Sequence, residues 1–580
     1  MPPTFRMVPH PLALACLLTL AACAVGPSEQ VAGITGAAPA QLEPARGASL
    51  QACDALVGQF RYSDTRIDSA AAVAAGPIVP NGHAVVAHCL IKGKMKDRKG
   101  ADGQDYAIGF EMRLPQSWNG RFYYQGNGGI DGVVQPAHGA LGGGPTTGAL
   151  AQGFAVISSD AGHTAGQNPR FGAEPQARAD YGYRAVGNLT PMAKALIRAA
   201  YGKGPDRSYI GGCSNGGRHT MVAAARYGDQ FDGYLVGAPG YRLPNAALAQ
   251  LWAAPQWKAL ATPDATIAHP FNPSARIADL GSALTAAERR TVAGAIIERC
   301  DALDGARDGI VGDTATCQAA FNLERDVPTC RAERDGQCLT AAQKRLLGAV
   351  YAGGTTPSGQ MIYSTFPWDT GIAAANWAQW KFVNAQVLDP AAGYIFMTPP
   401  RSLDPFAVDI EGGYKAIFAT DANFGESADT MMTPPGKDNP SHLAALRARG
   451  AKVLIYHGVS DAIFSADDTV AFMRRLERAL GGRSDDFARY FPVPGMAHCS
   501  GGPATDQFDA LTPLVRWVEQ GVAPASIPAR ARGAGNAGGV NAELPPTWAS
   551  NRSRPLCPWP SVARYIGSGN PDDAVSFNCR

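Results

Sequence analysis

The chain has 580 residues, of which 46% are hydrophobic and 17% are charged, and its formal net charge is +2 at pH 7. This composition is typical of a globular protein and excludes a disordered one. A charge so close to zero gives no electrostatic reason to expect nucleic acid or an anionic membrane surface as a partner. Because the chain is too long for one ordinary domain, we expect a core domain with a large insertion or a second domain.

The first 23 residues have the pattern of an export signal. Arg6 precedes an apolar stretch at about 11–22, which is too short to span a bilayer. This stretch ends in Leu-Ala-Ala-Cys, which resembles the bacterial lipoprotein cleavage box and makes Cys23 the expected lipid anchor; ordinary secretion, with Cys23 incidental, is the alternative. Residues 24–50 are rich in Ala, Gly and Pro and predict a flexible tether. We therefore expect a periplasmic, outer-membrane or secreted protein.

Export changes the interpretation of the cysteines. Cys16 and Cys23 belong to the signal region, and the ten that remain are an even number, which predicts disulfides in an oxidising compartment. Spacing alone does not fix the connectivity. It favours four local pairs, namely Cys53–Cys89, Cys300–Cys317, Cys330–Cys338 and Cys557–Cys579. That arrangement leaves Cys213 and Cys499 over.

A strand that opens into a glycine-rich loop is expected at residues 121–129, which read Arg-Phe-Tyr-Tyr-Gln-Gly-Asn-Gly-Gly. A plain turn is one interpretation, and a phosphate cradle is disfavoured because no Lys-Ser or Lys-Thr follows. The place of the loop in the chain suits one of the two backbone donors with which hydrolases stabilise an oxyanion. For this donor we favour Gly128, with Gly129 as its rival.

The segment 206–225 has the pattern of a nucleophile elbow. A short strand runs into Gly-Cys-Ser-Asn-Gly at 212–216, and a helix of small residues follows. G-x-S-x-G between a strand and a helix forces a strained turn that exposes the serine at the edge of the sheet. An ordinary glycine-rich turn is the alternative. We expect Ser214 to be the nucleophile and the backbone N–H of Asn215 to be the first oxyanion donor.

The core strand that follows the elbow ends near Pro239, and the next core strand begins at Lys452. The long segment between them is rich in tryptophan and proline, and an α/β-hydrolase commonly accepts a lid at this point. We therefore expect an α/β fold with a mostly parallel sheet. The catalytic domain would be made of residues 51–240 and 451–580, and the lid of residues 241–450.

An acidic loop lies inside this expected lid. Between Cys300 and Asp313 carboxylates recur at short spacing, and glycines let the chain wrap around them, as a hard oxygen-binding cation requires. A solvated acidic loop is the alternative, but like charges held so close together need a counter-ion. The expected calcium ligands are the carboxylates of Asp301, Asp304 and Asp308 and the carbonyl oxygens of Ala306 and Ile310.

The sequence also supplies the acid and the base that an elbow serine needs. Residues 452–456 read as a buried strand and lead into a loop that carries Asp461, and a later strand leads into His498. The order serine, acid, histidine is that of an α/β-hydrolase. Asp467 and Asp468 are rivals for the acid, but they fall where the next helix begins and suit its N-terminal charge. We expect Asp461 to orient His498, and His498 to act as the base.

The two remaining cysteines adjoin these residues. Cys213 immediately precedes Ser214, and Cys499 immediately follows His498. If the serine and the histidine are in hydrogen-bond contact, the neighbouring sulfurs are close enough to pair, and the bond would join the elbow to the histidine loop. Two free cysteines are the alternative, which an exported chain disfavours.

These motifs together resemble the tannase and feruloyl esterase family. The matching residues are Gly-Cys-Ser-Asn-Gly-Gly around Ser214, Asp461 with Phe464 three residues on, Met-Ala-His-Cys ending at Cys499, and the Cys-Asp-x-x-Asp-Gly-x-x-Asp-Gly loop from Cys300. The resemblance covers about residues 53–579. It implies a carboxylic ester hydrolase with a calcium-binding lid loop, a disulfide beside the serine and histidine, and the five cysteine pairs above.

The family implies esters of aromatic acids (feruloyl, galloyl or hydroxybenzoyl) as substrates. One branch cleaves mono-hydroxyethyl terephthalate and holds the free carboxylate with a lid arginine. The corresponding stretch here, 389–396, has no arginine, and Arg401 is out of register. We therefore expect a feruloyl-type esterase first and a terephthalate monoester hydrolase second. The expected aromatic contacts are Phe464, Trp377 and Phe396, although each is also a natural core residue.

A non-catalytic surface lipoprotein that binds a ligand, and a peptidase on the same scaffold, are the rival hypotheses. The complete set of serine, acid and histidine argues against the first. As partner we expect a small aromatic ester, no nucleic acid, and a monomeric chain.

Overall fold

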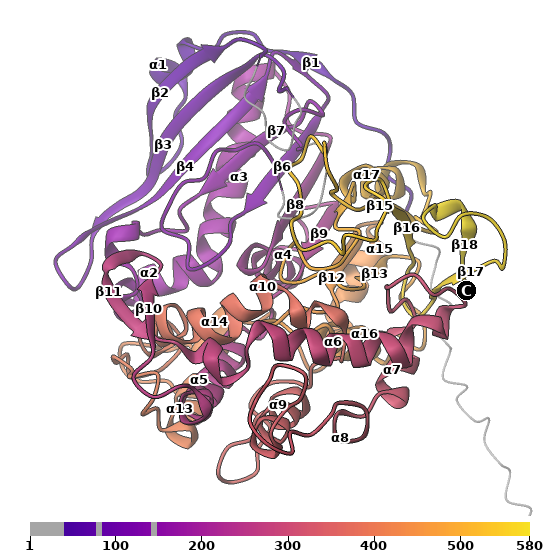
Figure 1. The fold of residues 1–580 in the computed structure, drawn as a ribbon. Helices are drawn as coiled ribbons and strands as arrows, with labels where there is room; N and C mark the ends of the chain where they lie inside the picture. The colour runs from indigo at the N-terminus through magenta and orange to yellow at the C-terminus, as the bar shows by residue number, and fades with distance from the viewer. Residues whose placement is uncertain (1–39, 77–83, 141–147) are drawn as a thin grey trace, which may run out of the picture. The chain divides into compact units, whose positions relative to one another are not determined.

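A computed structural model describes residues 40–76, 84–140 and 148–580. Its centre is a nine-stranded sheet in the order β13-β12-β9-β8-β6-β7-β4-β3-β2, in which the strands from β13 to β7 are parallel and β4, β3 and β2 are antiparallel (Figure 1). The strands are β2 (Thr65–Val73), β3 (His88–Lys99), β4 (Asp105–Pro115), β6 (Arg121–Gly126), β7 (Ala155–Ser159), β8 (Arg207–Cys213), β9 (Gly233–Gly237), β12 (Lys452–Gly458) and β13 (Ala488–Val493). This is the expected α/β-hydrolase core.

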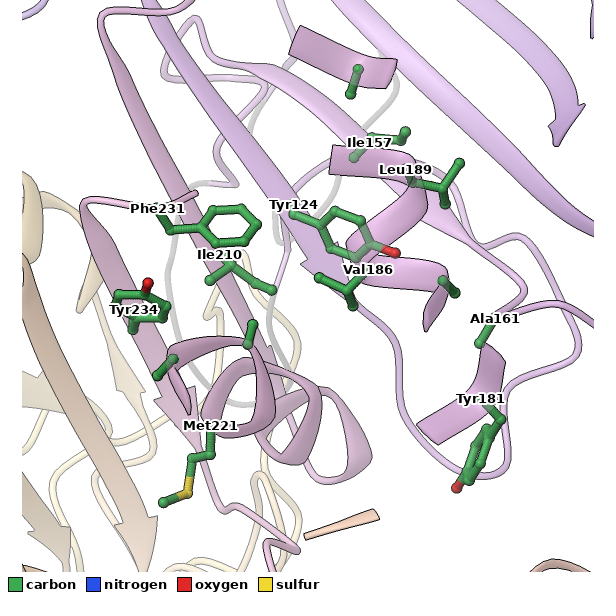
Figure 2. Close-up of a cluster of buried hydrophobic side chains, with 14 of the residues drawn as sticks. Tyr124, Ile157, Ala161, Tyr181, Val186, Leu189, Ile210, Met221, Phe231 and Tyr234 are labelled. Atoms are coloured by element: carbon green, nitrogen blue, oxygen red, sulfur yellow. The ribbon is translucent and has the colours of Figure 1, made fainter. Parts of the chain in front are cut away.

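Helices cover both faces of the sheet, because the side chains of each central strand alternate between two cores. Ile210 and Tyr234 point to one face, where they meet Val186, Leu189 and Met221 from helices (Figure 2). The neighbouring residues Tyr209 and Leu235 point to the other face and pack with Leu514. The helices of this part are α1 (Ala55–Gln59), α2 (Pro175–Ala179), α3 (Ala185–Tyr201), α4 (Asn215–Arg226), α16 (Ala466–Ala479) and α17 (Leu511–Gln520).

Strands β9 and β12 pair directly, with Val453 opposite Tyr234, so the whole segment 238–451 leaves the sheet between two neighbouring strands. This segment contributes many buried residues, such as Trp257 and Leu347, to a second hydrophobic cluster, which also includes Ala462, Ile463, Phe464 and Ala497 of the catalytic part. Its elements are α5 (Leu243–Leu260), β10 (Thr266–His269), β11 (Asn272–Ala278), α6 (Ala286–Cys300), α7 (Thr314–Ala320), α8 (Leu323–Asp326), α9 (Ala341–Ala352), α10 (Ala375–Ala378), α11 (Ala385–Val387), α12 (Ala392–Ile395), α13 (Ile410–Phe418), α14 (Ala428–Met432) and α15 (Ala444–Ala448). We call residues 241–450 the lid.

All five expected disulfides are confirmed. They join Cys53 to Cys89, Cys213 to Cys499, Cys300 to Cys317, Cys330 to Cys338 and Cys557 to Cys579. A small sheet of β14 (Gln507–Phe508), β15 (Ile527–Arg530) and β16 (Ser553–Leu556) and the pair β17 (Ala563–Tyr565) and β18 (Phe577–Cys579) complete the C-terminal region.

The expected signal, Cys23 and most of the expected tether lie outside the described residues. Within the tether, β1 (Ala48–Ser49) pairs with β5 (Ser117–Trp118), so the folded part begins before residue 51. In the part of the chain that the structure describes, no helix combines the length and the apolar character that a membrane crossing requires.

Candidate active site

Ser214 lies between β8 and α4 with a backbone φ of 66° and ψ of −127°. A residue with a side chain adopts this region only under strain, which is typical of a nucleophile elbow. The turn also brings its glycines against β6. A Cβ atom on Gly212 or on Gly216 would lie 2.4 or 2.3 Å from the carbonyl oxygen of Gly126. The sharp turn therefore requires glycine on both sides of the serine.

The structure brings Ser214, His498 and Asp461 together in one line of hydrogen bonds. The Oγ of Ser214 lies 2.8 Å from Nε2 of His498, and Nδ1 of His498 lies 2.7 Å from Oδ2 of Asp461. A carboxylate only accepts, so Nδ1–H of the imidazole donates to Asp461 and Nε2 is left to accept the serine proton. This is the tautomer that a general base needs.

The environment of Asp461 keeps its carboxyl ionised. Oδ1 accepts N–H bonds of 2.9 Å from Ile463 and from Phe464, and His457 lies 3.3 Å from Oδ2. Burial opposes ionisation, but electrostatic attraction to His498 and hydrogen bonds from His457 and His498 outweigh it, so the pKa of Asp461 is lowered. The acid is thus fixed in position and in charge.

The disulfide between Cys213 and Cys499 joins the two sides of this line. Its Cα atoms are 6.1 Å apart, and the two residues are 286 positions apart in the chain. Because each half-cystine adjoins a member of the hydrogen-bonded line, the bond limits how far Ser214 and His498 can separate.

The two residues expected to supply the oxyanion donors both lie next to Ser214. Asn215 begins α4, and a Cβ atom on Gly128 would lie 3.9 Å from the Cβ of Ser214. Buried side chains tie the two segments together, because Asp131 Oδ2 accepts from Asn215 Nδ2 at 2.8 Å and lies 2.9 Å from Nε2 of His219. Burial raises the pKa of Asp131 to about 7. The loop after β6 is thereby anchored to the start of the helix.

Two aromatic rings contact the imidazole of His498 edge to face. The ring centre of Phe464 lies 5.3 Å away, and that of Trp380, on the lid, lies 4.7 Å away. Trp377 is instead buried within the lid against Phe382, and Phe396 is buried in the large core beside the sheet. The sequence analysis expected Phe464, Trp377 and Phe396 as aromatic contacts; of these three only Phe464 contacts His498, and Trp380 was not expected there.

Sequence reasoning also missed a buried lysine of the lid. Lys381 is 3% exposed, and its Nζ lies 4.0 Å from the ring centre of Phe366. Burial lowers the pKa of Lys381 to about 7, although the charges of Asp461 and Asp389 favour its protonated form. In the sequence, an isolated lysine in a helical segment cannot be told from a surface residue, so no pattern indicated that Lys381 is buried.

The acidic loop of the lid holds two of its carboxylates out of water. Asp301 Oδ1 accepts N–H bonds from Asp308 and Gly309, and Asp304 Oδ1 accepts one from Ala306. Burial raises the pKa of both carboxyls, and the charges of Asp308 and Asp301 help to bring that of Asp304 to about 7.

The third carboxylate of this loop, on Asp308, pairs with Arg554. Among the described residues, no group of three or more His, Cys, Asp or Glu side chains is already gathered as a metal site. The chemistry of Asp301 and Asp304 nevertheless fits a cation, because no described Arg, Lys or His side chain forms an ion pair with either of them.

Comparison with known proteins places these features in one family. The family model described as tannase and feruloyl esterase matches residues 89–580. The chain is 36% identical to a mono(2-hydroxyethyl) terephthalate hydrolase of Piscinibacter sakaiensis, over 92% of each chain. It is 27% identical to a probable feruloyl esterase B-1 of Neosartorya fischeri, over 81% of this chain and 82% of that one.

Solved structures share the fold. Feruloyl esterase B from Aspergillus oryzae superposes with a TM-score of 0.70 at 24% identity, covering 91% of this chain and 99% of the other. The tannin acyl hydrolase from Aspergillus niger gives a TM-score of 0.65 at 19% identity, covering 91% and 95%. At these identities the likeness concerns the fold alone.

Proposed function

Because this chain belongs to the tannase and feruloyl esterase family and is a carboxylic ester hydrolase, we propose that it cleaves esters of aromatic acids through an acyl-enzyme on Ser214. The observation that carries this proposal is the hydrogen-bonded line from Ser214 Oγ through His498 to Asp461. A serine in this setting has both a proton acceptor and a partner that fixes the acceptor's tautomer.

The proposed reaction has two halves. Ser214 Oγ attacks the ester carbonyl while Nε2 of His498 takes the hydroxyl proton, and the resulting oxyanion accepts N–H bonds from Asn215 and Gly128. Collapse breaks the bond to the alkoxide, which leaves as the alcohol with the proton from His498. A water molecule then gives its proton to His498 and attacks the acyl-enzyme, which releases the acid and restores the serine hydroxyl.

The aromatic acyl group is supported by the rings beside the histidine. Phe464 and Trp380 present apolar surface at His498, and aromatic rings favour edge-to-face or offset contacts with another ring. The relatives named as feruloyl esterases support the same class. A terephthalate monoester is the second candidate because of the 36% identical relative, but the stretch 389–396 lacks an arginine for the second carboxylate.

An ester panel tests the acyl group. We expect methyl ferulate and methyl gallate to be hydrolysed with a higher kcat/KM than a terephthalate monoester, because the monoester would bury a carboxylate that no arginine of 389–396 pairs. Liberated acids are measured by liquid chromatography. The amide of ferulic acid serves as the control for peptidase activity, and preference for aliphatic esters over all three aromatic ones would contradict the proposed class.

We also propose that the lid loop binds a structural calcium ion. The ion would be held by the carboxylates of Asp301, Asp304 and Asp308 and by the carbonyl oxygens of Ala306 and Ile310. Asp308 would give up its ion pair with Arg554 to bind the cation. Two buried carboxylates without a basic partner support this, since a divalent cation would offset the cost of burying them. Its contribution would be to stabilise the loop, with no step of the reaction assigned to it.

Calcium is expected to raise the melting temperature of the chelator-treated protein. A ligand at 100 times its Kd stabilises the folded state by about 2.7 kcal/mol. Asp304→Asn should remove most of this shift, and Asp409→Asn, an exposed lid carboxylate that caps α13, should leave it intact. Differential scanning fluorimetry with calcium and with magnesium measures the shift; equal shifts in all three proteins would contradict the site.

Export to an oxidising compartment is the proposed location. Five disulfides support it, since such bonds persist outside the reducing cytosol. Lipidation at Cys23, ordinary secretion and a monomeric state remain expectations from the sequence.

A further inference from the structure

A carboxylate of the lid lies between the two loops that carry the acid and the base. Asp369 is 1% exposed, and its Oδ2 accepts the N–H of Gly495 at 2.7 Å and the O–H of Ser460 at 2.9 Å. Ser460 immediately precedes Asp461, and Gly495 lies three residues before His498. One oxygen atom of the lid therefore holds both loops.

No cation accompanies this buried charge. Within the described residues, Asp369 forms no ion pair with Arg, Lys or His; its partners are hydrogen-bond donors, including the N–H of Thr370 at 2.8 Å to Oδ1. Burial raises the pKa of Asp369, and the bonds from Gly495, Thr370 and Ser460 oppose that rise. Burying an unpaired carboxylate is costly for stability, so its presence suggests a gain of another kind.

The contact around Asp369 is tight. Gly371 N–H donates to Ser460 Oγ at 2.8 Å, and a Cβ atom on Gly371 would lie 2.3 Å from the Cβ of Ser460. Further along the lid, Asn376 exchanges two bonds of 3.3 Å with the backbone N–H and carbonyl of His498. The lid segment 369–376 thus contacts the acid loop through Asp369 and Gly371, and the histidine loop through Asp369 and Asn376.

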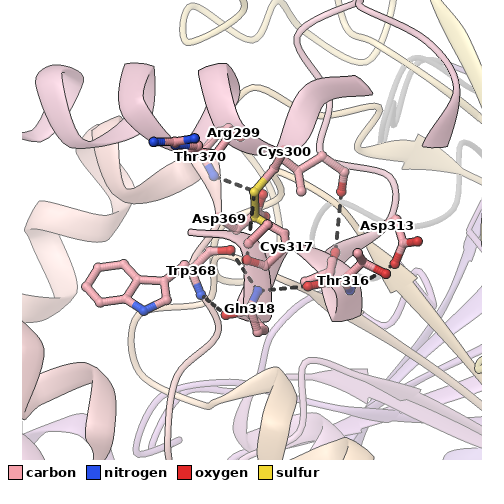
Figure 3. The surroundings of a disulfide bond; sticks show 12 residues. Arg299, Cys300, Asp313, Thr316, Cys317, Gln318, Trp368, Asp369 and Thr370 are labelled. Atoms are coloured by element: carbon pink, nitrogen blue, oxygen red, sulfur yellow. Dashed lines mark hydrogen bonds between the residues drawn. A yellow bond between two sulfur atoms is a disulfide. The ribbon is translucent and has the colours of Figure 1, made fainter. Parts of the chain in front are cut away.

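The backbone next to Asp369 is fixed by hydrogen bonds to the side chain of Gln318 (Figure 3). Gln318 accepts the N–H of Trp368 at 2.7 Å and donates to its carbonyl at 3.1 Å, which fixes the backbone one residue before Asp369. Gln318 lies on α7, and the disulfide between Cys300 and Cys317 joins α7 to the end of α6. Asp369 therefore lies in a part of the lid that hydrogen bonds and a disulfide hold in place.

We propose that Asp369 is a positioning residue, which sets the distance between Asp461 and His498 by holding Ser460 and Gly495 with one carboxylate oxygen. The lid then contributes to catalysis because it fixes the geometry of the hydrogen bonds that join Ser214, His498 and Asp461, in addition to covering the site. This inference rests on the proposed function, because it assigns Asp369 a role in the geometry of that same site. Displacements of about 1 Å in such a line cost roughly 10²-fold in rate.

The test compares Asp369→Asn with a matched lid variant. Asp429 is also a buried lid carboxylate, but its partners are Lys437 and Thr433 on the lid itself. With a chromogenic aryl ester we expect Asp369→Asn to lower kcat by about 10²-fold with KM within about twofold, because the hydrogen bonds of Asp369 go to Ser460, Gly495 and Thr370 and not to the two rings proposed to contact the acyl group. Asp429→Asn should leave both constants within about twofold, even where its melting temperature falls as far.

Ser460→Ala provides a second variant, which keeps the carboxylate and removes the hydroxyl that donates to it and accepts from Gly371, and we expect kcat to fall by about tenfold. It decides the question if Asp369→Asn does not fold. The inference is overturned if both variants fold with wild-type kcat, if Asp369→Asn does not fold and Ser460→Ala has wild-type kcat, or if Asp429→Asn loses kcat equally. Ser214→Ala, assayed in parallel, distinguishes failure of the proposed function from failure of the positioning role. Turnover in Ser214→Ala contradicts the proposed function. If Ser214→Ala is inactive and Asp369→Asn is fully active, only the positioning role is contradicted.

Discussion

Replacing Ser214 by alanine is expected to abolish turnover of any ester, with kcat lower by about 10⁶-fold. Losses of this size follow removal of the nucleophile from a serine, histidine and acid unit, because the remaining groups then have no atom on which to form the acyl-enzyme. The alanine should fold normally, since the elbow's tight contacts are made by Gly212 and Gly216 against Gly126 and not by the serine hydroxyl.

Ser208→Ala is the matched control, because Ser208 is a buried serine on the same strand, β8. It should retain wild-type kcat/KM in the same ester assay. A fluorophosphonate probe should label the wild-type protein and Ser208→Ala, and leave Ser214→Ala unlabelled by mass spectrometry. Measurable turnover or labelling in Ser214→Ala would identify a different nucleophile and remove the basis of the proposed mechanism.

The elbow and the strand ends could be predicted from the sequence because their causes are local. Gly212 and Gly216 flank a serine between a strand and a helix, and only glycine tolerates the approach to Gly126 seen in the structure. In a mostly parallel sheet, the carboxyl ends of neighbouring strands meet at one edge, so a serine, an acid and a histidine at three such ends are brought together.

The contributions of the lid could not be predicted in the same way, because they depend on packing between distant segments. Trp377 and Trp380 are equivalent in a hydrophobic pattern, yet only Trp380 contacts His498. Asp369 reaches Ser460 across 91 positions of the chain, and Asp308 meets Arg554 across 246. Nothing in the spacing of these residues indicates a partner so far away.

Removing the disulfide between Cys213 and Cys499, in the double variant Cys213→Ala/Cys499→Ala, is expected to lower both stability and turnover. In the chain-entropy description, a bond that spans 286 residues lowers the entropy of the unfolded chain and so stabilises the folded state by about 5.6 kcal/mol. Where the variant still folds, kcat should fall by about 10²-fold, since the separation of Ser214 from His498 is then held only by weaker contacts. Chemical denaturation and ester turnover measure the two effects.

The bond between Cys557 and Cys579 provides the control that separates those effects. It spans 22 residues, so its removal should cost about 3 kcal/mol. It joins β18 at the C-terminus to the end of the small sheet and touches neither Ser214 nor His498, so kcat of the folded variant should stay within about twofold. If both double variants lose stability but neither loses kcat, the Cys213–Cys499 bond only stabilises the fold. If only the Cys213 and Cys499 variant loses kcat, the covalent bond between the end of β8 and the histidine loop maintains the hydrogen bond through which Ser214 gives its proton to His498.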